Sequence, residues 1–310
     1  MKTSFFRLVI AGVTAAALFV PEASAQRQLG KKKGPTSKIY LAETEGEAQI
    51  STGDRIYEAK QATAFDAPGT VIETKENAHN AFVYSNGTGM FVDQDTRVEI
   101  DRFVQEPFKP ERTTAADAPV EPSLSQSDVF VARGAVGLCT SQMVSGSSMT
   151  YGTPHASVNI RGGRVSIATS PTETVIDLLD GDVTVRGGQR DIGGQILRPG
   201  ERATIRPGSF GQPPVITISQ TPREEAKVVD ERVAIACNAR KTVTFDVIEK
   251  KAEFGPEGSG EISSQAAGDG GDGADAEPGA GTEQEIVVRP TVPSQLPSNV
   301  VISPDRLTGT

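Results

Sequence analysis

The chain of 310 residues contains no tryptophan, two histidines and two cysteines, and only 5% of its residues are aromatic. The histidines, His79 and His155, and the two distant cysteines show no spacing typical of a zinc site. The scarcity of aromatic side chains also predicts a core of small and valine-type residues rather than of large rings. We therefore expect a protein that holds neither a metal nor a cofactor.

A recognisable catalytic set is also missing. The segment Ser145–Ser148 carries hydroxyl groups, but no base or oxyanion site can be named for it. Asp177, Asp180 and Asp182 form the pattern D-x-x-D-G-D, which lacks the spacing of an EF-hand and predicts a hairpin turn with solvated acids. Gly162-Gly163 precedes no helix start that would hold phosphate, so we interpret it as a turn. These absences predict a protein that is not an enzyme.

Concentrated positive charge is scarce as well. The formal net charge is −9, which argues against nucleic acid as a partner because affinity for phosphate backbones comes from clustered Lys and Arg. The run Lys31–Lys33 is typical of a solvated tail. After residue 25, no segment reaches the ~20 apolar residues that span a bilayer. We expect no stable membrane insertion of the mature chain.

The N-terminus has the pattern of an export signal. Lys2 and Arg7 form a basic start, Leu8–Val20 is apolar, and Ala23-Ser24-Ala25 places small residues where a signal peptidase cleaves. We expect residues 1–25 to be a signal peptide and the protein to be exported, periplasmic or secreted. A retained membrane anchor is the alternative.

The middle of the chain has the period-two pattern of β-strands. In the segment 97–103, Val98, Ile100 and Phe103 are expected to face a core, while Glu99 and Asp101 face water. The pairs Asn86-Gly87 and Asp180-Gly181 separate such runs and predict two-residue hairpin turns. About a dozen short strands between Lys38 and Arg206 predict an all-β sandwich, barrel or irregular solenoid.

One helix is expected near the C-terminal end of this domain. The segment Pro222–Ala239 begins with Thr221 as a capping residue and Glu224 as the second member of a capping box. Its apolar positions share one face, at Val229, Val233, Ala236 and Cys237.

The two cysteines, Cys139 and Cys237, suit an oxidising compartment. A disulfide between them would attach the helix to the β domain. Two buried free thiols are the alternative.

The tail at residues 255–310 is acidic and rich in Gly and Pro, and its composition predicts disorder. Two apolar triplets, Ile286–Val288 and Val300–Ile302, interrupt it. They are either docking motifs that add a strand to a partner's sheet or simply sticky residues in a dispensable tail. The sequence thus divides into a signal peptide (1–25), a flexible segment (26–37), a β domain (38–206) with a loop insertion (107–127), a helix and strand extension that packs on the domain (207–254), and the disordered tail (255–310).

The runs TPHASVNIRGGRVSI, TVIDLLDGDVTV and ILRPGERATI resemble the FecR domain family, and the resemblance extends over roughly Lys38 to Arg206. The family pattern is matched at Thr153-Pro154, Arg161-Gly162, Gly181 and Pro199-Gly200. One departure is Gly163, where the family generally has Thr. The resemblance implies an extracytoplasmic β-rich domain. Together with the helix and tails expected from the residues, we predict an all-β fold in a FecR-like β-solenoid or β-sandwich, with one C-terminal helix and disordered tails.

Well-known members of that family are membrane regulators that pass a siderophore-receptor signal to a sigma factor. Only Met1–Arg7 precedes the apolar run here, so we expect an exported, stand-alone version without the cytoplasmic segment that holds the sigma factor. The first hypothesis is therefore a binding module for an envelope protein or a surface polymer. The second is a periplasmic component of receptor-linked signalling in iron uptake or envelope stress. A remote third is a polysaccharide-active enzyme that uses carboxylates such as Asp177 or Glu99.

Overall fold

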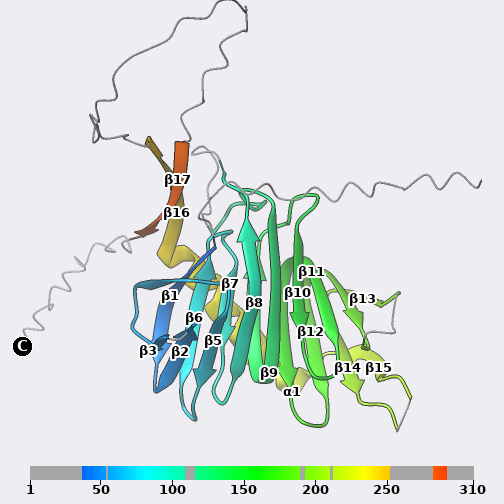
Figure 1. Cartoon of the computed structure of the whole chain (residues 1–310). Helices are drawn as coiled ribbons and strands as arrows, with labels where there is room; N and C mark the ends of the chain where they lie inside the picture. The colour runs from blue at the N-terminus through cyan, green and yellow to red at the C-terminus, as the bar shows by residue number, and fades with distance from the viewer. Residues whose placement is uncertain are drawn as a thin grey trace, which may run out of the picture. The chain divides into compact units, whose positions relative to one another are not determined.

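Figure 1 presents the protein as a computed structural model. The structure describes residues 37–291, with gaps at 54, 109–115, 189–192, 210–211 and 252–281. The expected signal peptide, nearly all of the expected flexible segment and most of the expected disordered tail, including Val300–Ile302, lie outside the described residues.

Within this part of the chain the fold is mostly β-structure with a single α-helix. The elements are β1 (Lys38–Glu45), β2 (Ala48–Thr52), β3 (Arg55–Glu58), β4 (Thr63–Asp66), β5 (Thr70–Thr74), β6 (His79–Tyr84), β7 (Gly89–Val92), β8 (Arg97–Gln105), β9 (Ser125–Thr140), β10 (Ser148–Gly152), β11 (Ser157–Thr169), β12 (Thr174–Arg186), β13 (Gln195–Leu197), β14 (Glu201–Arg206), β15 (Val215–Gln220), α1 (Arg223–Ala239), the 3-10 helix η1 (Arg240–Thr242), β16 (Val243–Lys251) and β17 (Thr282–Pro290).

The strands β1–β15 form one branched sheet whose pairing divides it into two layers. The first layer has the order β3-β2-β5-β8-β9-β10-β11-β12-β13, and the second has the order β4-β1-β6-β7-β9-β11-β12-β14-β15. The pair β9–β10 is parallel, whereas every other strand pair within these layers is antiparallel. The expected all-β fold is confirmed for the described residues.

Strand β9 belongs to both layers because it bends in its middle. Residues up to Arg133 pair with β8, and residues from Gly134 onward pair with β11. Gly134 has φ +86°, and a Cβ there would lie 2.1 Å from the Thr96 hydroxyl oxygen. Only glycine fits such a bend at low energetic cost. Strands β11 and β12 change layers in the same way at their own glycines.

The side chains between the two layers form one hydrophobic cluster, mainly of Val and Ile. The expected alternation in β8 is confirmed, because Val98, Ile100 and Phe103 are all at most 1% exposed. Near the centre of the core, the hydroxyl groups of Tyr84 and Tyr151 lie 3.6 and 3.7 Å from the sulfur of Met90. Burial raises the pKa of both tyrosines, so they remain neutral hydrogen-bond donors to a weak acceptor.

Helix α1 covers the outer face of the second layer, against β6, β7 and β9 (Figure 1). The expected apolar stripe is buried at Val229, Val233 and Ala236. The sheet surface beneath the helix is flat at Gly89, where a Cβ would lie 2.1 Å from the Ala236 carbonyl oxygen. This close approach explains why small residues occupy both sides of the contact.

The start of the helix differs from the expected capping box. Residue Pro222 occupies the N-cap position, and no side chain caps the helix. The Thr221 hydroxyl instead donates to the Asp177 carboxylate at 2.8 Å. The capping prediction is wrong because the N-cap position falls on Pro222, one residue after Thr221, and the Thr221 hydroxyl is directed at the buried carboxylate on β12.

Three further expectations are corrected by the described strands. The loop expected at 107–127 is shorter, because β9 begins at Ser125. No turn lies at Asp180-Gly181, since β12 continues through both residues, and Gly162-Gly163 likewise lies within β11. The triplet Ile286–Val288 lies in β17, which pairs with β16 of the same chain.

Candidate functional site

Three of the residues that carry the FecR resemblance, Arg161, Gly162 and Gly181, line one surface cavity of about 370 Å³. The cavity lies where β11 and β12 cross from one layer to the other. Its other walls come from the end of β9, from Ala118-Pro119, and from Arg240 after helix α1. The structure thus brings the residues identified from the sequence together with Arg240, which the sequence did not indicate.

The floor of this cavity is bare backbone. A Cβ at Gly163 would lie 2.0 Å from the Asp180 carbonyl oxygen and 2.6 Å from the Gly181 Cα. Both glycines have positive φ, of +118° and +109°. A threonine or any other side chain at position 163 would therefore not fit this crossing.

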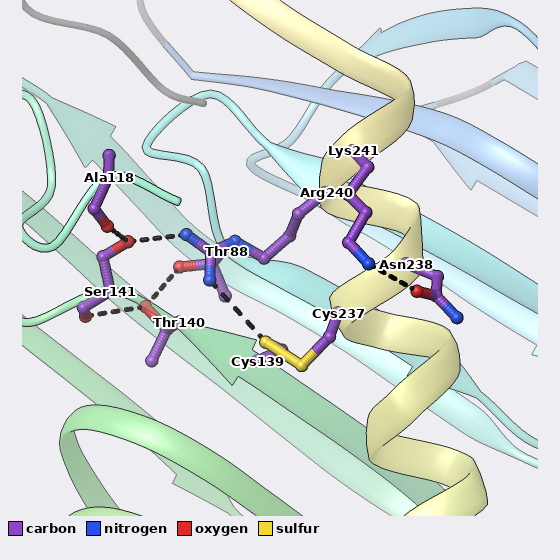
Figure 2. The surroundings of a disulfide bond; sticks show 9 residues. All are labelled: Thr88, Ala118, Cys139, Thr140, Ser141, Cys237, Asn238, Arg240 and Lys241. Atoms are coloured by element: carbon purple, nitrogen blue, oxygen red, sulfur yellow. Dashed lines mark hydrogen bonds between the residues drawn. A yellow bond between two sulfur atoms is a disulfide. The ribbon is translucent and has the colours of Figure 1, made fainter. Parts of the chain in front are cut away.

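A disulfide between Cys139 and Cys237 borders the site (Figure 2). The S–S distance is 2.12 Å and the Cα–Cα distance is 5.1 Å. Cys139 extends from the outer face of β9, and Cys237 extends from helix α1. Of the alternatives that the sequence left open, the structure therefore contains the bonded form.

Arg240 lies beside the disulfide and is only 6% exposed. As Figure 2 shows, its Nη2 donates to the Ser141 hydroxyl oxygen at 2.6 Å, and its Nη1 lies 3.6 Å from the Cys139 sulfur. The Ser141 hydroxyl in turn donates to the Ala118 carbonyl oxygen at 2.6 Å. The guanidinium is therefore held in one orientation by neutral partners.

The charge of Arg240 has no close counter-ion in the described part of the chain. No carboxylate there forms an ion pair with it, and its Nε is buried without a hydrogen-bond partner. Burial lowers the pKa of the guanidinium, and the Asp117 carboxylate opposes this effect from a longer distance. A buried cation without a partner is energetically costly.

Asp177 is not a solvated acid, so that expectation is wrong. Its carboxylate is 3% exposed and accepts two hydrogen bonds from Arg202, at 2.7 and 3.0 Å. Arg202 also donates to Glu225 of helix α1 at 2.6 Å. This network attaches β12 and β14 to the first turns of the helix.

The expected turn at Asn86-Gly87 joins β6 to β7, but its asparagine does more than turn the chain. Asn86 is 3% exposed and donates to the Ser125 hydroxyl at 3.1 Å. Ser125 donates to the buried carboxylate of Glu121 at 2.6 Å, which also accepts from the Val144 N–H at 3.0 Å. Burial is the largest influence on Glu121 and raises its pKa.

The remaining motif residues stabilise turns. The Thr153 hydroxyl oxygen accepts from the Ala156 N–H at 2.9 Å, which closes the Thr153-Pro154 turn before β11. Pro199-Gly200 joins β13 to β14, and the Gly200 N–H donates to the Leu178 carbonyl at 2.7 Å. Among the described residues no group of three or more His, Cys, Asp or Glu side chains is placed to hold a metal.

The open edges of the two layers differ in chemistry. Strands β3, β4 and β13 end three of the edges, and β15 ends the fourth. In β15 five of six residues are exposed, including Val215 at 59% and Ile218 at 38%. This strand carries no charged side chain and no proline.

Sequence patterns did not indicate Arg240, Glu121 or β15 as notable. The sequence alone does not show that Arg240, which follows a helix, is buried. It also does not show that Glu121, in a proline-rich segment, lies under the end of a strand. The charge-free run VITISQ of β15 between prolines was the one available signal.

No helix in the described ranges is long and apolar enough to cross a membrane.

Comparison with protein families found no matching family model, and no curated protein matched. Two crystal structures of a candidate anti-sigma factor from Parabacteroides distasonis, at 2.50 and 1.65 Å resolution, gave TM-scores of 0.35 with 13% and 12% sequence identity. The matched region covers 51% of this chain and 62% of the other chain in both cases. The chain is thus similar over part of its length to these anti-sigma-type structures, at a low score.

Proposed function

We propose that this protein is a non-enzymatic, exported binding module of the cell envelope that captures an extended segment of another envelope protein. The segment would pair with strand β15 and extend the second layer by one strand. This mode of recognition uses backbone hydrogen bonds for affinity and side-chain contacts for selectivity.

The observation that carries the proposal is the exposed, uncharged edge at β15. Natural proteins protect free edges with charges, prolines, bulges or short strands, since an open edge invites pairing with other chains. Here the six residues VITISQ are rich in β-branched side chains, and all of them except Ile216 are exposed. Pro214 and Pro222 bound the strand on either side. The pairing surface is therefore open but limited in length.

The direction of the backbone groups supports the same interpretation. The Thr221 N–H donates to the Gly200 carbonyl at 3.1 Å, just beyond the paired residues Gln220 and Glu201. Hydrogen-bonding direction alternates along an antiparallel strand. The backbone groups of Ile218 consequently point away from β14, toward the open side.

The other three edges are protected by the features that β15 lacks. Strand β3 has the sequence RIYE with a charge at each end. Strand β4 ends with Asp66, which pairs with Lys38 at 2.6 Å, and β13 has three residues. This contrast favours one pairing edge rather than general stickiness.

The non-enzymatic part of the proposal is supported by what the two suggested carboxylates already bind. Both oxygens of Asp177 accept hydrogen bonds from Arg202, and Glu99 accepts one from Arg97 at 2.8 Å. Asp177 therefore has no free oxygen for a general acid or nucleophile, and Glu99 pairs with Arg97 through one of its oxygens.

The test places a photo-crosslinking amino acid at Ile218 of the full-length protein in its own cells. The matched control places it at Ile56 on β3, an isoleucine that is 71% exposed on a protected edge. We expect one crosslinked envelope protein at position 218 that is absent at position 56. A second strain carries Ile218→Pro, which removes an outward N–H and should abolish the capture of that protein by the tagged chain.

The identity of the captured protein separates the hypotheses. An outer-membrane receptor supports the receptor-linked signalling alternative, and a structural envelope protein supports a scaffolding role. Equal crosslinking at both positions, or crosslinking only to polysaccharide, would contradict strand addition at β15. Mass spectrometry of the mature N-terminus tests export, because cleavage after Ala25 leaves Gln26 as the first residue.

A further inference from the structure

We propose that the cavity beside the disulfide binds a carboxylate group of a ligand, with Arg240 as the main contact and Arg161 as the second. This site is separate from the β15 edge, and it does not depend on strand addition.

The first step is the donor balance of Arg240. A guanidinium has five N–H donors and is always charged under ordinary conditions. Two of these donors are directed at the Ser141 oxygen and the Cys139 sulfur. The other three have no acceptor among the described residues, and the Nε–H is fully buried. A carboxylate can accept from the Nη–H groups that Ser141 and Cys139 leave free, as arginine forks commonly bind it, whereas the buried Nε–H is out of a ligand's reach.

The second step is that the guanidinium is already oriented. Ser141 gives its proton to the Ala118 carbonyl oxygen, so its oxygen must accept from Arg240. The disulfide fixes Cys139 on the other side. A ligand therefore meets a preorganised donor set and loses less affinity to side-chain ordering.

The third step concerns the charges around the cavity. Arg161 lines the wall, is exposed, and makes no ion pair within the described ranges. Asp180 and Asp182 line the same cavity. The two arginines and two aspartates leave no excess of positive charge, and Asp117 adds a more distant negative charge, so the acids repel a carboxylate with one charge less than a dianionic phosphate. This balance is the reason for assigning a carboxylate rather than a phosphate.

The fourth step is space. The glycines of the β11–β12 crossing leave the floor without side chains, and the cavity volume of about 370 Å³ is at the small end of ligand sites. The size suits a terminal group, such as the carboxylate end of a peptide or an acidic sugar, rather than a whole cofactor.

The experiment uses the intact, oxidised protein and follows the Arg240 Nε–Hε signal by NMR at constant ionic strength. N-acetylglycine is the carboxylate probe, and N-acetylglycinamide is its neutral match. We expect a saturable shift with the acid, with a dissociation constant in the millimolar range, and no shift with the amide. Galacturonate, titrated in the same way, distinguishes a sugar acid from a peptide carboxylate by which probe binds more tightly.

Two variants test the assignment. Arg161→Met should weaken binding of N-acetylglycine by roughly fivefold, as expected for one partly exposed ion pair. Arg164→Met is the control, because Arg164 lies on β11, is exposed and is outside the cavity lining. The variant Arg240→Met identifies which Nε–Hε signal belongs to Arg240. If this variant fails to fold, the titration of the unmodified protein with acid and amide still tests the proposal. Equal shifts with acid and amide, tighter binding of inorganic phosphate, or an unchanged affinity in Arg161→Met would overturn the proposal.

Discussion

The disulfide between Cys139 and Cys237 allows a quantitative test of how helix α1 is held on the sandwich. The two cysteines are 98 residues apart in sequence. In the chain-entropy model, opening a closed loop of this size raises the entropy of the unfolded chain and removes about 4.7 kcal/mol from the free energy of unfolding. The double variant Cys139→Ala/Cys237→Ala should lose up to this amount.

The loss should appear as a lower melting temperature with the native fold retained. Val229, Val233 and Ala236 remain buried against the sheet, so the helix keeps its packing when the covalent bond is gone. For a domain of this size, a change of 4.7 kcal/mol lowers the melting temperature by roughly 10–20 °C. Urea unfolding of the oxidised protein, the reduced protein and the double variant gives the three free energies at one temperature.

The comparison also contains its own control. Reduction should destabilise the unmodified protein by the same amount as the double variant, and the double variant should not respond to a reductant. A loss below about 1 kcal/mol, with an unchanged slope against urea, would refute the loop-entropy reasoning. It would mean that the unfolded chain already keeps this helix close to its strand.

Three other substitutions test separate contacts by urea unfolding. Gly89→Ala should cost about 1–3 kcal/mol because the added methyl meets helix backbone, whereas Gly193→Ala should be nearly neutral since the added methyl would meet no described atom within 4 Å. Arg202→Met should cost about 3–5 kcal/mol because it leaves a buried carboxylate unpaired, whereas Lys227→Met, in an exposed pair, should change stability by less than about 0.5 kcal/mol. Glu121 has a raised pKa in the folded protein, so its contribution is favourable at low pH and is lost as pH rises from 4.5 through the raised value. Across that pH range the free energy of unfolding of the unmodified protein should therefore fall relative to that of Glu121→Gln. A difference between the two proteins that does not change with pH would contradict the burial of the carboxylate.

Strand content and the helix face were predictable because they depend on local periodicity. Val98, Ile100 and Phe103 are spaced for one side of a strand with a bulge, and the structure buries all three. Val229 and Val233 likewise follow the helical period. Such patterns report burial on one face, which is what a two-layer fold requires of each element.

The long strands were not predictable for a physical reason. In a sequence, a glycine inside a strand has the same pattern as a glycine in a turn, so the sequence predicts a hairpin at Gly181. In the structure it allows β12 to cross from one layer to the other beside Gly163. Distinguishing a turn from a crossing requires knowledge of which strands pair, and that information is not local.

The site depended on similar long-range information. Arg161, Gly162 and Gly181 were identified through the family pattern, but only as structural positions. Arg240 follows a helix that ends above β9, so its burial depends on contacts nearly a hundred residues apart in sequence. Likewise, Ile286–Val288 was interpreted as a sticky or docking triplet because its partner strand, β16, lies on the other side of a long acidic segment.

Strand β9 has a mechanical consequence. Two stacked sheets usually resist sliding only through side-chain contacts, but here β9, β11 and β12 each run from one sheet into the other. Sliding the layers would require breaking backbone ladders in all three strands at once. A domain joined in this way should yield to force as one unit, so a pull transmitted through a strand added at β15 would be borne by the whole sandwich rather than by a single sheet.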